Sequence, residues 1–178
     1  MEKPEKLGVT VAFTSEMGRF YGIWATTELT VDFAICKLLS VPHEEGHLIT
    51  AGVGFNQRAR LLQALVKRKN AARGNEIIDA LRTIQNESLR NTFAHSFLTG
   101  NEKTVEFVER SRHGLYNPKV HQFTLEEFQD HVQKFWQAGQ KLFAALGDPY
   151  EEFQQFAEAA IHAASSERTS SVLQSDKT

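Results

Sequence analysis

Apolar residues recur at helical spacing along most of the chain. In the first such stretch Phe20, Trp24 and Val31 belong to one stripe, while Leu29 and Phe33 add apolar character on another side. Residues that repeat every three or four positions share one face of a helix. The predicted helices span about residues 17–39, 56 to beyond 66, 75–96, 124–146 and 149–164. The first helix, apolar on two sides, is expected to be covered by its own bundle and by a second subunit.

Local signals mark where the later helices begin and end. Thr124 and Glu127 have the spacing of a capping box, in which each side chain binds the backbone N–H of the other residue. Gly147 follows the same helix and suits the left-handed conformation that ends one. The last stretch of the chain is rich in serine and charge, so we expect a disordered tail over residues 165–178.

One segment departs from the helical pattern. In KTVEFVERSRHGLYNPKVHQFT, residues 103–124, β-branched and aromatic residues alternate around the turn-forming pairs His-Gly and Asn-Pro. This pattern predicts a small β-hairpin before the penultimate helix. The expected fold class is therefore all-α, an antiparallel helical bundle of four to five long helices with the hairpin inserted, forming a single domain over residues 1–164.

The composition is typical of a globular protein outside the membrane. Of the 178 residues, 41% are hydrophobic and 24% are charged, and no apolar run approaches the roughly 18 residues needed to cross a bilayer. The N-terminus has no cationic segment followed by an apolar one, so no signal peptide is predicted. The single Cys36 cannot form an internal disulfide, which agrees with a reducing compartment. We expect a cytoplasmic protein without membrane association.

Positive charge is concentrated in one part of the chain, although the net charge is only −2. No acidic residue occurs between Glu45 and Glu76. The basic residues that fall there are Arg58, Arg60, Lys67, Arg68, Lys69 and Arg73. Such a segment is either the solvated face of a helix or an electrostatic track for a phosphate backbone. The second interpretation predicts RNA binding.

Two motifs that suggest other enzymes lack parts that their chemistry needs. HEEGH, residues 43–47, matches the H-E-x-x-H zinc pattern, but Pro42 and Gly46 favour a surface loop or a single helical turn. No acidic residue in Gly46–Asn75 is available as a third ligand. Cys36 lies in a predicted packed helix and is expected to be buried rather than nucleophilic. We therefore expect no metal and no cofactor.

RNTFAH, residues 90–95, brings together groups that metal-free phosphodiester chemistry uses. Histidine titrates near neutrality and can exchange protons, and arginine can hold a phosphoryl group through charge-assisted hydrogen bonds. At about 100° per residue, Asn91 and His95 share one side of a helix, whereas Arg90 lies about 140° from His95. One helix alone does not form a compact site. A half-buried, structural His95 is the competing interpretation.

This motif and its setting resemble the HEPN domain family, whose signature is R-x4–6-H with a polar residue, often asparagine, directly after the arginine. RNTFAH matches the R-x4-H form. In that family the signature lies on a late helix of an all-α bundle. It follows a long first helix, similar here to GIWATTELTVDFAICKLL, and a basic, leucine-bearing second helix. The resemblance covers about residues 17–147.

The resemblance implies a homodimer in which two copies of the motif line a shared cleft, with active members acting as metal-independent endoribonucleases. His95 would be the proton-transfer residue, Arg90 the phosphate stabiliser and Asn91 a polar positioner. Arg82 and the basic segment would guide RNA. Phe97 stands where the toxin subgroup that continues the motif as H-x-Y has tyrosine, so toxin activity is not implied. Defence or stress response is the expected setting.

Two functions from different classes follow from these observations. A ribonuclease needs Arg90 and His95 exposed in a basic cleft. A non-catalytic protein-interaction module with the same helical fold would bind a protein partner through the apolar first helix and the hairpin, and would tolerate replacement of both residues.

Overall fold

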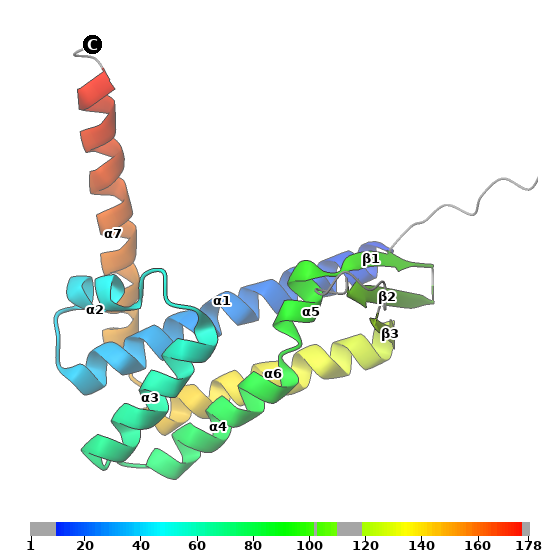
Figure 1. The fold of residues 1–178 in the computed structure, drawn as a ribbon, viewed down its shortest axis with the longest axis horizontal. Coiled ribbons are helices and arrows are strands. Elements are labelled where there is room, and N and C mark those ends of the chain that lie inside the picture. Colours follow the sequence, from blue (N-terminus) through cyan, green and yellow to red (C-terminus); the bar gives the residue numbers. More distant parts are fainter. Residues whose placement is uncertain (1–9, 102, 110–118, 176–178) are drawn as a thin grey trace, which may run out of the picture. The chain divides into compact units, whose positions relative to one another are not determined.

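A computed structural model of the chain describes residues 10–101, 103–109 and 119–175. Within these ranges, the side chains of Asn91 and of residues 163–175 lie outside the description. Most described residues are helical, and the other regular structure is a small antiparallel sheet (Figure 1). The mostly helical fold predicted from the sequence is confirmed.

The helices and strands follow the predicted order, with additions. Before the sheet the helices are α1 (Val11–Leu39), α2 (His43–Thr50), α3 (Phe55–Lys69), α4 (Gly74–Glu87) and α5 (Arg90–His95). The strands are β1 (Phe97–Gly100), β2 (Thr104–Glu109) and β3 (Lys119–Thr124). The chain continues with α6 (Leu125–Ala145) and α7 (Tyr150–Ser175).

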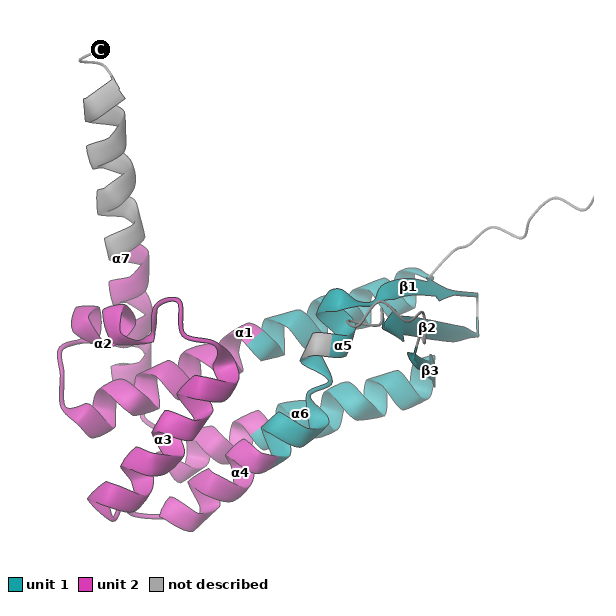
Figure 2. Ribbon diagram, in the orientation of Figure 1, with its two compact units in different colours: residues 1–24, 83–138 teal, residues 25–82, 139–178 magenta. Residues whose placement is uncertain are grey.

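The chain divides into two compact units, of which the first comprises residues 1–24 and 83–138 (Figure 2). Its described part includes the first half of α1, α5, the sheet and most of α6. The core of this unit is aromatic. The centroid of the Phe93 ring lies 4.9 Å from that of Phe20, 4.6 Å from Phe107 and 5.5 Å from Phe128. Ring pairs at such distances attract one another beyond their buried area, so Phe93 fixes α5 to α1, β2 and α6.

The sheet has the strand order β1-β2-β3, and both pairs are antiparallel. Successive side chains of a strand point to opposite faces. Val105 and Phe107 are buried and therefore define the inner face, whereas Val108 between its partners Phe97 and Val120 lies on the outer face. The two strands of the predicted hairpin correspond to β2 and β3, and the turn predicted between them, at residues 110–118, lies outside the described residues. The third strand, β1, is an addition that the sequence pattern did not predict.

The second unit comprises residues 25–82 and 139–178. Its described part includes the second half of α1, α2, α3, most of α4 and α7. Phe33, Cys36 and Phe156 form a buried cluster within it. Gly46 of α2 packs so closely that an added Cβ would lie 2.7 Å from the Cys36 Sγ. The glycine that argues against a long HEEGH helix is thus required for packing.

The capping predictions for α6 are confirmed. The backbone N–H of Thr124 donates to Glu127 Oε2 at 2.8 Å, and the N–H of Glu127 donates to Thr124 Oγ1 at 3.2 Å. The hydrogen bond from the Thr124 backbone N–H, with a smaller contribution from the Thr124 hydroxyl, holds the pKa of the Glu127 carboxyl below its usual range. Gly147, two residues beyond the helix, has a φ of 89°, as expected for a glycine that ends a helix.

The helix predicted over residues 75–96 is interrupted directly before the RNTFAH motif. α4 ends at Glu87 and α5 begins at Arg90. Leu89 between them has a φ of 42°, in the left-handed region that a leucine rarely adopts. The local sequence holds neither glycine nor proline there, so no ordinary signal marks the break. The break allows Phe93 to enter the aromatic core, which overrides helix propensity.

Other boundaries also differ from the predictions. HEEGH begins α2, a helix of eight residues rather than a single turn, because it packs on α7. α7 ends at Ser175 and not near residue 164, so most of the tail predicted to be disordered over 165–178 is helical, and residues 176–178 lie outside the described part. That segment contains no glycine or proline to stop the helix. The single domain over residues 1–164 stays a prediction. The chain divides into two units, and the helices α1 and α6 each contribute residues to both.

Candidate functional site

The RNTFAH motif forms its own short helix, α5, whose two sides differ in burial. Thr92 and Phe93 are buried, with exposed fractions of 5% for each. Arg90 is half-buried, and His95 in the last turn is exposed. The predicted third member of the site, Asn91, has a side chain outside the described part. The structure exposes His95, whereas the competing interpretation expected a half-buried, structural histidine.

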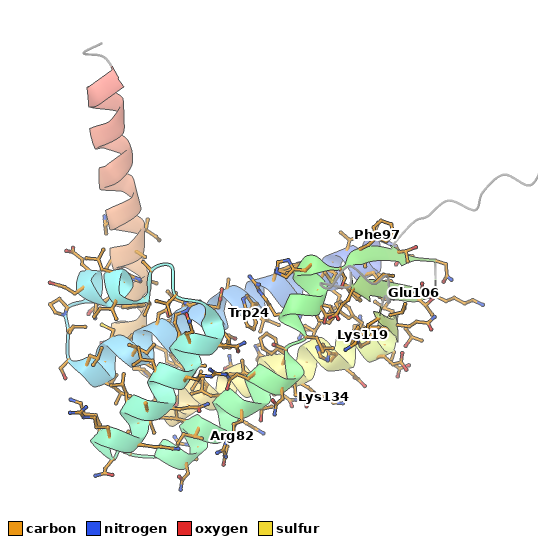
Figure 3. The ribbon with its side chains drawn as sticks, in the orientation of Figure 1. Trp24, Arg82, Phe97, Glu106, Lys119 and Lys134 are labelled. Carbon is orange, nitrogen blue, oxygen red and sulfur yellow. The ribbon has the colours of Figure 1, made fainter. Side chains whose placement is uncertain are left out.

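Arg90 is held against an aromatic side chain of α1. Its guanidinium carbon lies 5.8 Å from the centroid of the Trp24 ring, within the range of a cation–π contact. Trp24 in turn stacks on Phe135 of α6, with centroids 5.7 Å apart and an angle of 20° between the ring planes. Trp24 is labelled in Figure 3. The arginine thus has a defined place at the edge of the core while its side chain stays partly open to solvent.

Two hydrogen bonds hold α5 in addition to the Phe93 ring. The Tyr21 hydroxyl of α1 donates to the backbone carbonyl of Phe93 at 3.2 Å. The Thr92 hydroxyl donates to Glu109 Oε1 at the end of β2. The His121 Nε2 of β3 lies 3.9 Å from the same carboxylate oxygen. α5 is only six residues long, so these contacts, and not helix cooperativity, fix its orientation.

The predicted RNA-binding residues fall on the second unit and divide into two groups. Arg58 does not belong to an exposed basic surface, because it donates to Asp32 Oδ2 at 2.6 Å and to Glu28 Oε1 at 2.8 Å with 12% of its side chain exposed. Arg73 forms an ion pair with Glu76, and Arg82 forms one with Asp79. Among the predicted RNA-binding residues, those that are exposed and form no ion pair within the described part of the chain are Arg60, Lys67, Arg68 and Lys69.

The HEEGH histidines pack on α7. The His47 ring stacks on Phe156 at 3.9 Å between centroids, and its Nε2 lies 2.8 Å from the Phe156 carbonyl oxygen. His43 meets the same ring edge-on at 5.7 Å. Among the residues that the structure describes, no group of three His, Cys, Asp or Glu could hold a metal ion. HEEGH therefore serves the packing of α2.

Cys36 is buried beside this cluster. Its Sγ lies 3.2 Å from the Val41 carbonyl oxygen, to which the thiol donates. Burial, with a smaller contribution from Glu45, raises the pKa of the Cys36 thiol. A thiol that resists ionisation is a poor nucleophile, so the packing role predicted for Cys36 agrees with its surroundings.

Sequence reasoning missed the residues that support the motif, namely Tyr21, Trp24, Thr92, Glu109 and His121. One signal was available for Glu109. In TVEFVE every second residue, namely Val105, Phe107 and Glu109, lies on the same side of the strand. A carboxylate therefore ends a row that is otherwise apolar. A charged group at a position predicted to face inward indicates a special role.

Comparisons with models of known protein families, with curated proteins and with solved structures return no match to this chain. No helix in the described ranges combines the length and hydropathy that crossing a bilayer requires. The class that the fold and site define is a mostly helical protein with a small sheet and an Arg–His motif on a short, firmly held helix.

Proposed function

We propose that this protein is a HEPN-like RNA-cleaving or RNA-binding protein that acts through Arg90 and His95. One observation carries the proposal. α5 exposes His95 and keeps Arg90 half-buried over Trp24, while Thr92 and Phe93 anchor the helix. Arg90 places a charged guanidinium at a half-buried position, where a helix with only a packing role would have an apolar residue.

The chemistry assigned to the motif is metal-independent cleavage of a phosphodiester. His95 takes the proton of the ribose 2′-hydroxyl or gives one to the leaving oxygen, and Arg90 stabilises the charge that develops on the phosphoryl oxygens. Asn91 positions the phosphate. The expected products carry a 2′,3′-cyclic phosphate and a 5′-hydroxyl.

The active form in this proposal is a homodimer in the cytoplasm. Arg90 and His95 stand five positions apart, which places them about 140° apart around a helix. Two copies of α5 facing each other would bring Arg90 of one chain near His95 of the other. We further infer that the long helices α1, α3, α4 and α6 form the antiparallel bundle expected from the sequence.

RNA would be guided by the exposed part of the basic segment. Arg60, Lys67, Arg68 and Lys69 are exposed on α3 and can contact phosphates without breaking an ion pair. Arg73 and Arg82 contribute less because each has an acidic neighbour. Arg58 is excluded from this role by its buried ion pairs.

The decisive experiment measures cleavage of a mixed RNA pool in EDTA by the wild type, Arg90→Ala and His95→Ala. His162→Ala is the matched control, because this histidine is also exposed on a helix. Circular dichroism checks that all variants fold alike. We expect only the wild type and the control to cut. If every protein cuts equally, the nuclease is a contaminant and the motif loses its role. If none cuts or binds RNA, the proposal fails.

A mixing experiment tests whether the site is shared between two chains. Arg90→Ala and His95→Ala proteins are unfolded together and refolded. In a random mixture half of the dimers are heterodimers, and each has one intact site out of two. Activity should therefore recover to about one quarter of the wild-type value. No recovery in a mixture shown by light scattering to be dimeric would place both residues of a site in one chain.

The second candidate function is a non-catalytic protein-interaction module. It is favoured by a row of apolar side chains across the outer face of the sheet, in which Phe97 and Val120 are 57% and 55% exposed on either side of Val108. Phe97 is labelled in Figure 3. Exposed apolar groups in a contiguous row are typical of contact surfaces. The interaction-module function is supported if the double variant Arg90→Ala/His95→Ala keeps the protein's function in cells and Phe97→Asp abolishes that function.

A further inference from the structure

The inner face of the sheet changes from apolar to polar at one end. Val105 and Phe107 are 1% exposed and belong to the core. Glu109, the next residue of β2 on this face, stands opposite Lys119 of β3. His121, opposite Phe107, is diagonal to Glu109 on the same face. Three ionisable side chains therefore gather where the apolar row ends.

This polar cluster is bonded directly to the motif helix. Glu109 Oε1 accepts the hydrogen bond of the Thr92 hydroxyl, and the same oxygen lies 3.9 Å from His121 Nε2. The side chains of His121 and Glu109 are 33% and 35% exposed. They are thus shielded enough to be held in place and open enough to meet a ligand from solvent.

The cluster lies on the His95 side of α5. Thr92 and His95 stand three positions apart, and residues at this spacing are neighbours on a helix surface. Arg90 is two positions before Thr92 and points about 160° away from it. The Glu109–His121 pair is therefore connected to the proton-transfer end of the motif and not to its phosphate-binding end.

We propose that His121 is a second proton-transfer residue of the RNA-cleaving site and that Glu109 is its positioning residue. This inference rests on the proposed function. Cleavage of RNA without a metal needs a base for the attacking 2′-hydroxyl and an acid for the leaving oxygen. The motif supplies a single histidine. His121, whose Nε2 lies 3.9 Å from the carboxylate that accepts the Thr92 hydrogen bond, can supply the other.

The two histidines divide the reaction as follows. His95 removes the 2′-hydroxyl proton while that oxygen forms a bond to phosphorus. The bond from phosphorus to the 5′ oxygen breaks, and protonated His121 donates its proton to that oxygen. The products are the 2′,3′-cyclic phosphate and a free 5′-hydroxyl. Glu109 holds the His121 imidazole in the orientation for the transfer, as a carboxylate does for a catalytic histidine.

The test compares RNA with a substrate whose leaving group needs no proton. In uridine 3′-(4-nitrophenyl) phosphate the nitrophenolate leaves as a stable anion. His121→Gln and His121→Ala should slow RNA cleavage by about 100-fold or more and slow the nitrophenyl ester by less than about threefold. His95→Ala should abolish both reactions. Glu109→Gln retains an oxygen that can accept the hydrogen bond of the Thr92 hydroxyl. This variant should slow RNA cleavage by about tenfold or more and should not slow cleavage of the nitrophenyl ester.

The control is Gln122→Ala, which alters the neighbouring residue on the outer face of β3 and should change neither reaction. If the wild type cuts RNA, His95→Ala does not, and both His121 variants cut normally, the present inference is wrong while the proposed function stands. If both His121 variants lose the two reactions equally, His121 is not the acid, and the inference is again overturned. If the wild type cuts neither substrate, the cleavage activity in the proposed function fails and this inference fails with it, whether or not the protein binds RNA.

Discussion

Replacing Arg58 with alanine should destabilise the protein strongly, although Arg58 lies in the segment predicted to bind RNA. Its guanidinium donates to Asp32 and Glu28 at 2.6 and 2.8 Å, and only 12% of its side chain is exposed. Each hydrogen bond to a charged group contributes about 1.5–3 kcal/mol. Because the carboxylates keep some contact with water, we expect a loss of about 3 kcal/mol, at the lower end for breaking a buried ion pair.

Arg60→Ala provides the matched control two positions further along α3. Arg60 is exposed, and surface substitutions of this kind change stability by about 0.5 kcal/mol or less. Its loss should instead weaken binding of single-stranded RNA and reduce the salt dependence of that binding. The two arginines are therefore expected to separate stability from binding.

The free energy of unfolding that the Arg58→Ala protein loses relative to the wild type should also depend on pH. Burial raises the pKa of Asp32, and the hydrogen bond and charge of Arg58 partly oppose that rise. Without Arg58 the pKa of Asp32 rises further. A carboxyl with a raised pKa stabilises the fold fully below its unfolded pKa, and this contribution is lost as the pH rises through the folded value. The loss of unfolding free energy in Arg58→Ala should therefore become smaller as the pH falls from about 7 towards about 4.

The assay is urea unfolding of the wild type, Arg58→Ala and Arg60→Ala at several pH values, followed by circular dichroism. Binding of a fluorescent RNA is measured by anisotropy at a temperature where all three are folded. Equal, small losses of stability for both variants would refute the assignment of Arg58 to a structural ion pair. An RNA affinity that falls as far for Arg58→Ala as for Arg60→Ala would also refute it.

Three further predictions concern the packing of each unit. Burial lowers the pKa of His131. The contribution of His131 to stability should therefore be full above about pH 6.5 and fall as the pH drops through the lowered pKa. In thermal melts, His131→Phe should remove this part of the dependence of Tm on pH. Phe107→Ala should cost about 3–5 kcal/mol in urea unfolding, whereas Phe97→Ala on the outer face should cost far less. Gly46→Ala forces a methyl group against Cys36, and a lower Tm, equivalent to about 1–3 kcal/mol, is expected.

The helices and their apolar faces could be predicted from the sequence, because both depend on residues close together in the chain. The capping box of Thr124 and Glu127 operates over three positions, and its two reciprocal hydrogen bonds are present. The inward residues of α4, such as Ile77, Leu81 and Ile84, are buried as their spacing indicates. Trp136 follows the buried Val132 of α6 by four positions, a spacing that predicts an inward side chain, yet it is 40% exposed.

The candidate site could be predicted only in part. The sequence identified Arg90 and His95 as a pair of chemically capable residues, but not the helix break that separates them from α4. Leu89 adopts a left-handed conformation that no local signal favours, and the packing of Phe93 and the bond from Thr92 to Glu109 compensate for it.

Tertiary structure also decided which charges are available. Arg58 and Arg60 look alike in a basic segment, yet Arg58 is paired across 26 positions with Asp32. Glu109 reaches Thr92 across 17 positions. Hydrophobic periodicity and capping are local properties and can be read along the chain. The pairing of charges depends on which distant elements meet, and that is fixed only when the core packs.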